Sequence, residues 1–541
     1  MSGAPDGPGV LWEIALRLCL LSDTHVGAAR AVPRHTVGGD ADLPVDRDPG
    51  TGAPRLRATT LAGLLRHELA SRTGDPDSVR ALMGAARAHT PTNPDASATS
   101  ALDVDDALAE LPEGTAVAVR TGTRVDPASG TVQPGRVWRW EILPAGTVLT
   151  AHMRLRVCAP ADEARLLTLL LLATDGLAGP GASGPGAGVG GRTGRGYGTV
   201  RATHWAARRH DLADEHDWFA YHARSWARRW SEGADALAGA PADLADALTA
   251  ELRASGRTAA AAHLAARADQ PDRRHRDELH LTLAVAERSD PTGPPGHGLR
   301  PGLLMVGDPP DHERTGEADR AHRHRPAVTD PYQPAVHLAP VLGDTALFAL
   351  LKRIGGRLVR DAAEHLGSPT GRWRDWHGRW WGADTDRHGR PRPSRIRLRT
   401  VPVLTGGAPL TTTRLTVDSL FGDAVDGRLF TTDLHCGGSA EAVVDVRGPD
   451  DAVRGLLTLL VRELATVPFD TLGAGAGSGN GRLTATRALL VTRPGDGGPP
   501  HTVDLLAAVF DPDSAEAATA RGWSAALRTA LAPDDAEEAP R

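Results

Sequence analysis

An internal repeat constrains the fold of this chain more than any other feature of its sequence, because a duplicated segment implies a duplicated unit. Residues 125–147 align without a gap to residues 417–439. Both copies open on Val-Asp, carry a Gly-Arg pair at the same place, and match Glu141 with Asp433. In each copy a turn precedes an alternating strand, and a glycine turn then leads into another strand. The sequence therefore predicts two related units in one chain.

The elements expected around the repeat follow the same order in both halves. Each half gives a strand, a long loop, a helix, strands, a second helix, a Gly-rich loop and a last strand. The helices are expected over 60–70 and 161–174 in the first half, and over 344–360 and 450–466 in the second. This is a decorated β-α-β-β-α-β order, which is typical of ferredoxin-like domains.

The predicted class is therefore α+β, with two tandem ferredoxin-like (RRM-like) domains that carry long loop insertions. The first domain is expected over 10–206 and the second over 277–495. An Ala- and Arg-rich helical linker is expected over 207–276, and a helical C-terminal tail over 496–541.

The charge of the chain limits how it can bind nucleic acid. The formal net charge is −6, so any phosphate contacts must come from local basic surfaces. Lys352 is the only lysine among 61 basic residues. The others are arginines, which suit phosphate contacts and base stacking better than lysine does.

Cysteine use and hydropathy predict a cytoplasmic protein. Cys19, Cys158 and Cys436 lie far apart and form no C-x-x-C pair, which argues against a disulfide framework or a cysteine-rich zinc site. We find no apolar run of about 18 residues and no signal-peptide pattern at the N-terminus.

The first half contains three ordered motifs that resemble the RAMP superfamily. A short loop with Gly27 follows the first strand, Gly-Gly-Asp-Ala-Asp-Leu-Pro-Val stands at 38–45, and Pro-Arg-Leu-Arg-Ala-Thr-Thr-Leu opens a helix at 54–61. The pattern is closest to the backbone subunits of type III CRISPR interference complexes that cleave target RNA. The family's Pro-Gly-Ser-Ser is replaced by Arg-Ala-Thr-Thr at 57–60, and the second half departs further.

This resemblance implies a guide-RNA-binding backbone subunit of an antiviral CRISPR complex, built from two fused RAMP modules. Its partners would be guide RNA, complementary target RNA and other CRISPR effector subunits, with no membrane. Metal-dependent cleavage of target RNA would take place in the first RAMP domain. Two alternatives stay open: a metal-independent ribonuclease that processes guide RNA, and a structural RAMP subunit without an active site.

The Gly-rich loop at 191–198 is the predicted RNA-binding element. Glycines allow backbone N–H groups to approach phosphates, arginines add charge, and a tyrosine can stack on a base. The loop lacks the G-x-x-x-x-G-K-[ST] pattern of a nucleotide-binding P-loop. The predicted RNA contacts are Arg66, Arg192, Gly194, Arg195, Gly196 and Tyr197.

The predicted cleavage residue is Asp42, at the aspartate of the family's G-G-x-D-x-P-V motif, and Asp40 competes with it. The resemblance implies that the RNA's own 2′-hydroxyl is the nucleophile and that Asp42 holds Mg²⁺ or water beside the phosphate. In the second half Asp308, Asp311 and Asp319 lie in the corresponding loop, and no motif chooses among them.

Histidines and tryptophans leave further alternatives. A processing nuclease could use one of the loop histidines as a general base, namely His25, His35, His322 or His324. The Arg- and Trp-rich stretch 372–381 suits single-stranded RNA, a subunit interface or a core. In the linker, Trp218, Phe219, Trp226 and Trp230 form an aromatic cluster, and the spacing of Trp218, Trp226 and Trp230 predicts packing along one helix face.

Overall fold

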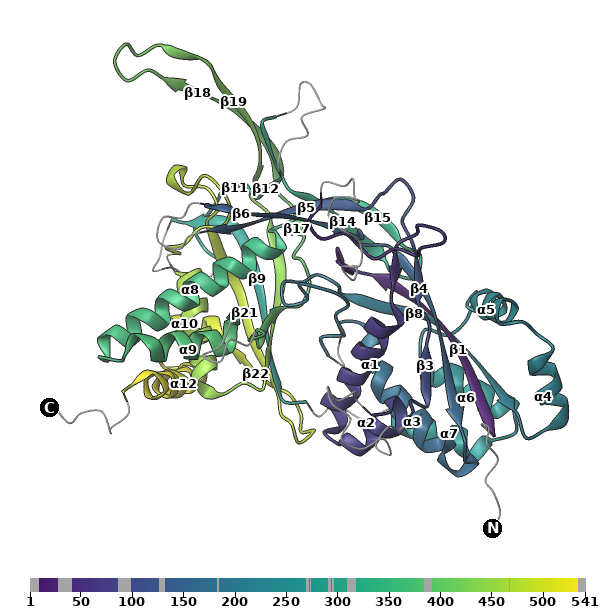
Figure 1. Ribbon diagram of the computed structural model, residues 1–541. Helices are drawn as coiled ribbons and strands as arrows, with labels where there is room; N and C mark the ends of the chain where they lie inside the picture. Colours follow the sequence, from purple (N-terminus) through teal and green to yellow (C-terminus); the bar gives the residue numbers. More distant parts are fainter. Residues whose placement is uncertain are drawn as a thin grey trace. The chain divides into compact units, whose positions relative to one another are not determined.

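A computed structural model describes residues 9–27, 41–85, 99–125, 132–181, 184–268, 272, 274–289, 293, 296–308, 318–383, 392–466 and 468–533. The chain forms two compact units (Figure 1). The first unit comprises Met1–Thr193, Tyr197–Asp272 and Pro326–His337. The second unit comprises Gly194–Gly196, Arg273–Arg325 and Leu338–Arg541.

The first unit is built on a six-stranded sheet in the order β2-β4-β7-β1-β8, with β3 also paired to β7. The strands are β1 (Val10–Leu20), β2 (Arg55–Leu56), β3 (Leu102–Val104), β4 (Ala107–Glu110), β7 (Val148–Val157) and β8 (Val200–Asp211). All of these pairings are antiparallel, and Ile14 of β1 lies opposite Met153 and Ala207. The first strand, β1, thus lies between β7 and β8, and β8 forms one edge of the sheet.

Seven α-helices belong to the described part of the first unit. They are α1 (Ala58–Thr73), α2 (Pro76–Met83), α3 (Glu163–Thr174), α4 (Glu215–His222), α5 (Trp226–Asp235), α6 (Leu244–Ala254) and α7 (Thr258–Ala268). Side chains alternate between the two faces of a strand, so Trp12, Ile14 and Leu16 point to one face of the sheet. They form one core with leucines of α1, α3, α6 and α7. Short 3₁₀ turns, η2 (Pro160–Asp162) and η3 (Asp175–Ala178), flank α3.

The second unit repeats this arrangement, with a seven-stranded sheet in the order β16-β20-β9-β21-β22. In addition, β10 pairs with β9, and β17 pairs with β20. The strands are β9 (Arg276–Arg288), β10 (Leu299–Pro301), β16 (Ile396–Leu398), β17 (Leu404–Thr405), β20 (Ser439–Arg447), β21 (Leu483–Arg493) and β22 (His501–Asp504). Strand β9 lies between β20 and β21, as β1 lies between β7 and β8.

The helices of the second unit pack into one core with this sheet. They are α8 (Asp344–His365), α9 (Thr370–Trp381), α10 (Asp451–Ala465), α11 (Leu505–Phe510) and α12 (Ala515–Leu531), with a 3₁₀ turn η4 (Ala476–Ser478). Figure 1 shows α8, α9, α10 and α12 on one side of the sheet. Mixed helices and antiparallel sheets in both units confirm the α+β class.

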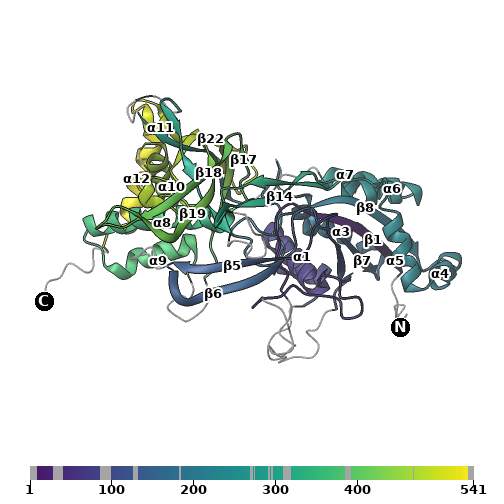
Figure 2. The same cartoon turned by 90° about the horizontal axis from the view of Figure 1, so that it is seen from above.

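Smaller sheets extend from each unit. Figure 2 shows β5 (Ala118–Val125) and β6 (Val132–Ile142) as a separate two-stranded ribbon. A five-stranded sheet contains β11 (Leu303–Leu304), β12 (Gly307–Asp308), β13 (Arg320–His322), β18 (Ala408–Val417) and β19 (Ala424–Cys436). A further pair joins β14 (His324–Asp330) to β15 (Ala335–Pro340).

The β18–β19 hairpin projects from its unit and exposes apolar side chains at its far end (Figure 1). Leu420 and Phe421, at the turn, are 80% and 79% exposed. Leu415 and Leu429 face each other across the two strands and are also exposed. The far end of this hairpin is therefore an exposed apolar cluster.

The Arg- and Trp-rich stretch is part of the core of the second unit. It forms α9, in which Trp376, Trp380 and Trp381 are at least 95% buried. Trp376 and Trp380 lie one turn apart and therefore face the same side of the helix. Of the three alternatives for 372–381, the core is the one observed for these tryptophans.

The prediction that the linker tryptophans pack along one helix face is wrong for Trp218. Trp218 is 42% exposed, and the neighbouring Phe219 is 59% exposed. The helix ends at His222 and a new one begins at Trp226, capped by Ser225, whose hydroxyl accepts the N–H of Arg228. The spacing that favoured one face therefore spans a break between α4 and α5.

The cysteines and the hydropathy of the helices bear on two further expectations. The three cysteines are free thiols: Cys19 is buried, Cys436 is half-buried and Cys158 is exposed. Within the ranges that the structure describes, no helix combines the length and apolarity that a membrane span needs.

Candidate cleavage site and RNA-binding loop

The segments carrying the sequence motifs of the first half meet beyond the C-terminal end of β1. They are the loop after β1, the segment around Asp42, the end of β6 and the Gly-rich loop. Isolated β-bridges join them in pairs: Thr24 with Leu143, His25 with Gly191, Gly27 with Val45, and Leu43 with Trp140. Motifs far apart in the sequence thus form one local structure.

Asp42 is held against β6 by its backbone and its side chain. Its N–H donates to the carbonyl oxygen of Arg139 at 2.9 Å, and its carboxylate Oδ2 accepts the N–H of Arg139 at 2.9 Å. The side chain is exposed, so a bound strand can reach it. Asp40, the competing candidate, lies outside the described residues.

The other acidic residues near Asp42 have structural partners. Asp46 is buried and pairs with Arg55 at 2.9 Å and Arg57 at 2.6 Å. The hydrogen bond from Arg57 holds the pKa of the Asp46 carboxyl below its usual value, against the opposing effect of burial. Glu141 accepts the N–H of Val45 at 2.9 Å. These contacts fix the segment that carries Asp42.

A magnesium ion at Asp42 would need ligands from the RNA. Among the described residues, no group of three or more His, Cys, Asp or Glu side chains could hold a metal ion. Mg²⁺ commonly binds through one or two carboxylates together with water and substrate phosphates. The exposed carboxylate of Asp42 fits that chemistry.

The Gly-rich loop is fixed at both ends by glycines that no other residue could replace without strain. Gly190 and Gly198 have φ values of +79° and +72°. A Cβ on Gly190 would lie 2.2 Å from the carbonyl oxygen of His25, and one on Gly198 would lie 2.0 Å from that of Val189. The loop therefore has a defined path between these two points.

Arg192 lies in this loop, above two tryptophans of β6. Its guanidinium carbon is 3.7 Å from the ring centroid of Trp140 and 5.7 Å from that of Trp138. Among the described residues, Arg192 is the one non-glycine residue with a positive φ, +64°. Stacking on Trp140 restricts the side chain and thereby orients its charge.

Sequence reasoning missed the role of Trp138 and Trp140. The signal was present in the alternation Trp-Arg-Trp at 138–140, which places both rings on one face of a strand. Only the three-dimensional contact shows that this face supports Arg192.

Two predicted RNA contacts have packing roles in this structure. Tyr197 is 2% exposed and packs with Trp140 and Ile142, so its ring is not available for stacking on a base in this conformation. Arg66 donates hydrogen bonds to the carbonyl oxygens of Met83 and Gly84, at the end of α2. Gly194, Arg195 and Gly196 are grouped with the second unit.

The loop histidines divide between the two units. His25 is buried, and its Nδ1 lies 2.7 Å from the carbonyl oxygen of Glu141, to which it donates a hydrogen bond. His322 is buried in the second unit, 5.6 Å from His435 between ring centroids. His35 lies outside the described residues.

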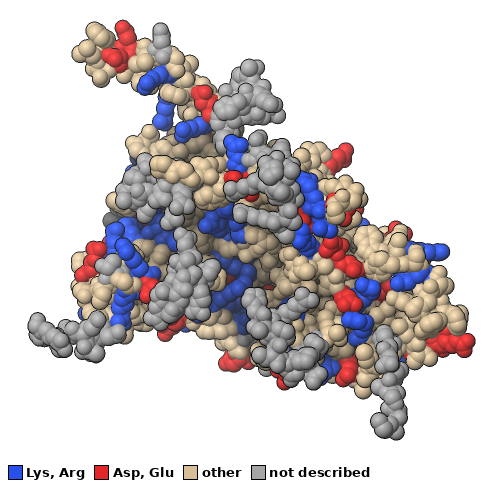
Figure 3. Space-filling model, viewed as in Figure 1, with Lys and Arg blue, Asp and Glu red and all other residues tan. Residues whose placement is uncertain are grey.

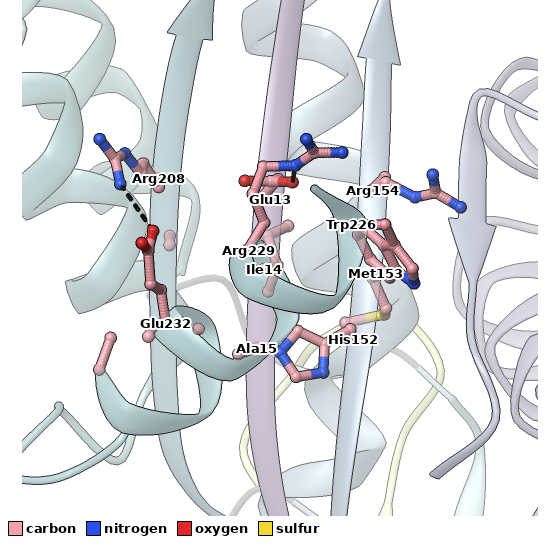
Figure 4. A pocket seen from close by; sticks show the side chains of 14 residues that line it. Glu13, Ile14, Ala15, His152, Met153, Arg154, Arg208, Trp226, Arg229 and Glu232 are labelled. Carbon is pink, nitrogen blue, oxygen red and sulfur yellow. Dashed lines mark hydrogen bonds and ion pairs between the residues drawn. The ribbon is translucent and has the colours of Figure 1, made fainter. Parts of the chain in front are cut away.

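The second face of the first sheet is covered by α5 (Figure 4). Glu13 on β1 accepts hydrogen bonds from Arg229 of α5 at 2.9 Å and pairs with His210 at 3.0 Å. A pocket of about 100 Å³ remains between the helix and the sheet, with Trp226 at its edge. This face of the sheet is therefore covered in the observed conformation, whereas RRM domains leave the corresponding face open to RNA.

His152 in this pocket makes the first unit sensitive to acid. Burial lowers the pKa of His152 to about 4, and its ring lies 4.5 Å from that of Trp230. An unfolded histidine titrates near 6.5, so the unfolded state binds more protons between pH 6.5 and 4. The free energy of unfolding therefore decreases as the pH is lowered through that window. We expect His152→Phe to reduce the stability lost between pH 8 and pH 5 by about 2 kcal/mol, measured by urea unfolding. The exposed His216, changed to Gln, is the control, and an unchanged pH dependence in His152→Phe would contradict the assignment.

Surface charge agrees with local rather than global attraction of RNA. Figure 3 shows Arg and Asp or Glu side chains interspersed on the visible face, including the β18–β19 hairpin. The net charge alone therefore gives no attraction for RNA, and a phosphate contact would need individual arginines such as Arg192.

The segment that forms this site matches the model of a known protein family. Residues 17–201 match the family model of the RAMP superfamily. The match runs from β1 to the start of β8 and includes Asp42 and the whole Gly-rich loop. Among curated proteins, none matches the chain. The match therefore supports a relation of residues 17–201 to the RAMP family. RAMP proteins bind RNA and work in CRISPR complexes.

Proposed function

We propose that the protein is a guide-RNA-binding backbone subunit of a type III CRISPR antiviral complex. We further propose that it cleaves target RNA in a reaction that uses Asp42 and Mg²⁺. The observation that carries the proposal is that the segment of Asp42 and the Gly-rich loop meet at the same strand: Leu43 pairs with Trp140, and Arg192 stacks on Trp140. Both lie within the residues that match the RAMP family. Guide RNA, complementary target RNA and other effector subunits are its proposed partners, and the cytoplasm is its proposed location.

The proposal includes two tandem ferredoxin-like RAMP domains, over 10–206 and 277–495, joined by a helical linker over 207–276. The family match covers the first of them. The shared sheet order supports the second, because β9 is flanked by β20 and β21 as β1 is flanked by β7 and β8. The exposed apolar end of the β18–β19 hairpin suits contact with another subunit.

The chemistry proposed at Asp42 is cleavage by the RNA's own 2′-hydroxyl. The 2′-oxygen forms a bond to the adjacent phosphorus, the bond from phosphorus to the 5′-oxygen breaks, and the 5′-oxygen takes up a proton as the 2′-hydroxyl loses one. Mg²⁺, when bound, supplies positive charge to the phosphate oxygens. Asp42 contributes a fixed carboxylate, since Arg139 holds it, and Arg192 adds positive charge in the neighbouring loop.

Replacing Arg192 with glutamine is expected to weaken binding of single-stranded RNA about 5- to 10-fold, because one phosphate contact is lost. The plot of log affinity against log salt should become shallower by about 0.7. Fluorescence anisotropy with a labelled RNA measures both quantities. Arg228→Gln, on the exposed surface of α5, is the control. Equal salt dependence in Arg192→Gln and the unmodified protein would remove Arg192 from the RNA site.

The experiment that tests the proposed activity is cleavage of a target complementary to the bound guide, with Mg²⁺ and then with EDTA. The proposal predicts products with 2′,3′-cyclic phosphate and 5′-hydroxyl ends in Mg²⁺ and none in EDTA. Cleavage that persists in EDTA would instead support the metal-independent processing nuclease. Binding of guide RNA without cleavage in either condition would support the structural subunit.

A further inference from the structure

The hydrogen bond that holds Asp42 in the first unit has a counterpart in the second. The carboxylate Oδ2 of Asp319 accepts the N–H of Thr431 on β19 at 2.7 Å, as Asp42 accepts the N–H of Arg139 on β6. The sequence repeat that matches Glu141 with Asp433 also matches Arg139 with Thr431. The two aspartates therefore occupy the same place relative to the repeated strand.

The backbone around both aspartates pairs in the same way. Leu43 and Trp140 form a parallel bridge, and Arg320 pairs in parallel with Thr432. The antiparallel partners are Gly27 with Val45 in the first unit and Gly307 with His322 in the second. These pairings align 42–48 with 319–325 without a gap, so the likeness extends along the whole segment.

The Gly-rich loops are anchored at equivalent points as well. Gly473 has a φ of +80°, and a Cβ there would lie 2.1 Å from the carbonyl oxygen of Met305, as Gly190 approaches His25. A Cβ on Gly481 would lie 2.0 Å from the carbonyl oxygen of Leu472, the same distance as for Gly198 and Val189. The second unit thus repeats both the aspartate and the loop beside it.

The side chains around Asp319 differ in charge from those around Asp42. Where the first segment has Leu43, Asp46 and Asp48, the second has three arginines, Arg320, Arg323 and Arg325. Arginine side chains attract phosphate. Asp319 and the adjacent Arg320 are both exposed, so Arg320 can contact a phosphate beside Asp319, whereas Arg325 is buried.

We infer that Asp319 is a second cleavage residue, so that one chain carries two sites for cleaving RNA, one in each unit. The inference rests on the proposed function and extends it to the second unit. The reaction is the one proposed at Asp42: a bond forms between the 2′-oxygen and phosphorus, the bond to the 5′-oxygen breaks, and one proton leaves the 2′-hydroxyl while another joins the 5′-oxygen. Of the three loop aspartates that the sequence left undecided, Asp319 is the one in the place of Asp42. Asp308 lies on β12, opposite Ala321. Asp311 lies outside the described residues.

The test uses the full chain loaded with guide RNA and an end-labelled complementary target. Asp42→Asn, Asp319→Asn and the double variant are compared with the unmodified protein, and Asp308→Asn is the matched control. Asparagine keeps an oxygen that can accept the backbone N–H but removes the charge. RNA affinity in EDTA is measured for every variant and should stay within about twofold.

The unmodified protein and Asp308→Asn are expected to give products from two positions of the target. Asp319→Asn should lose one product set by about 100-fold and keep the other, and Asp42→Asn should do the reverse. If Asp42→Asn alone removes all products, the second site is refuted while the proposed function stands. If the unmodified protein cuts nothing, the proposed function itself fails. A loss of RNA affinity in Asp319→Asn would overturn the cleavage role of that residue.

Discussion

Asp42→Asn is expected to lower cleavage at the first-unit site by roughly 100-fold, which corresponds to about 2.7 kcal/mol of lost transition-state stabilisation. The reason is the loss of the exposed Asp42 carboxylate, which the structure fixes against β6. The measurement is the rate at which product from that site appears under single-turnover conditions with Mg²⁺.

The choice of asparagine separates charge from structure at this position. Its side-chain oxygen can accept the N–H of Arg139, so the local backbone should keep its path. Asp42→Ala removes the charge and the hydrogen bond together, and both variants should lose cleavage alike. Glu110→Ala, an exposed carboxylate on β4, is the control and should cleave normally. Normal cleavage by Asp42→Asn would mean that the charge of Asp42 has no part in the reaction.

Gly198→Ala is expected to destabilise the first unit by at least about 3 kcal/mol. The backbone at Gly198 has a positive φ, and a methyl group there would lie 2.0 Å from the carbonyl oxygen of Val189. The substitution would also disturb two hydrogen bonds of Gly198, from its N–H to Asp23 and from Val189 to its carbonyl oxygen. Because the contact is with backbone, no side-chain movement can relieve it.

Urea unfolding followed by circular dichroism measures this effect, and the midpoint should fall in Gly198→Ala. Gly181→Ala, ten residues before the Gly-rich loop, is the matched control. An added Cβ at Gly181 meets nothing within 4 Å, and the φ there is not positive. That variant should lose no stability. Equal midpoints for the two variants would show that the loop does not depend on its anchor at Gly198.

Much of the fold followed from local patterns. The helix predicted over 161–174 is α3 (Glu163–Thr174), and the helix predicted over 450–466 is α10 (Asp451–Ala465). Alternating and helical periodicities give such elements because each reflects one buried face. Asp42 was found through a motif, and its position beside the Gly-rich loop agrees with one site.

Long-range contacts explain what local patterns did not give. The support of Arg192 by Trp140 joins the Gly-rich loop to a strand about 50 residues earlier. The cover of the first sheet by α5 depends on Glu13 and Arg229, which no spacing relates. Asp319 was one of three undecided aspartates until its hydrogen bond to Thr431 set it in the place of Asp42.

The central claim is that the chain binds guide RNA as a CRISPR backbone subunit. The most direct test is to purify the full chain from cells that also express the neighbouring CRISPR array and subunits, and to sequence the RNA that comes with it. The account predicts RNA from the array, retained at moderate salt together with the other subunits. A protein that carries no RNA, or only a random sample of cellular RNA, would contradict it.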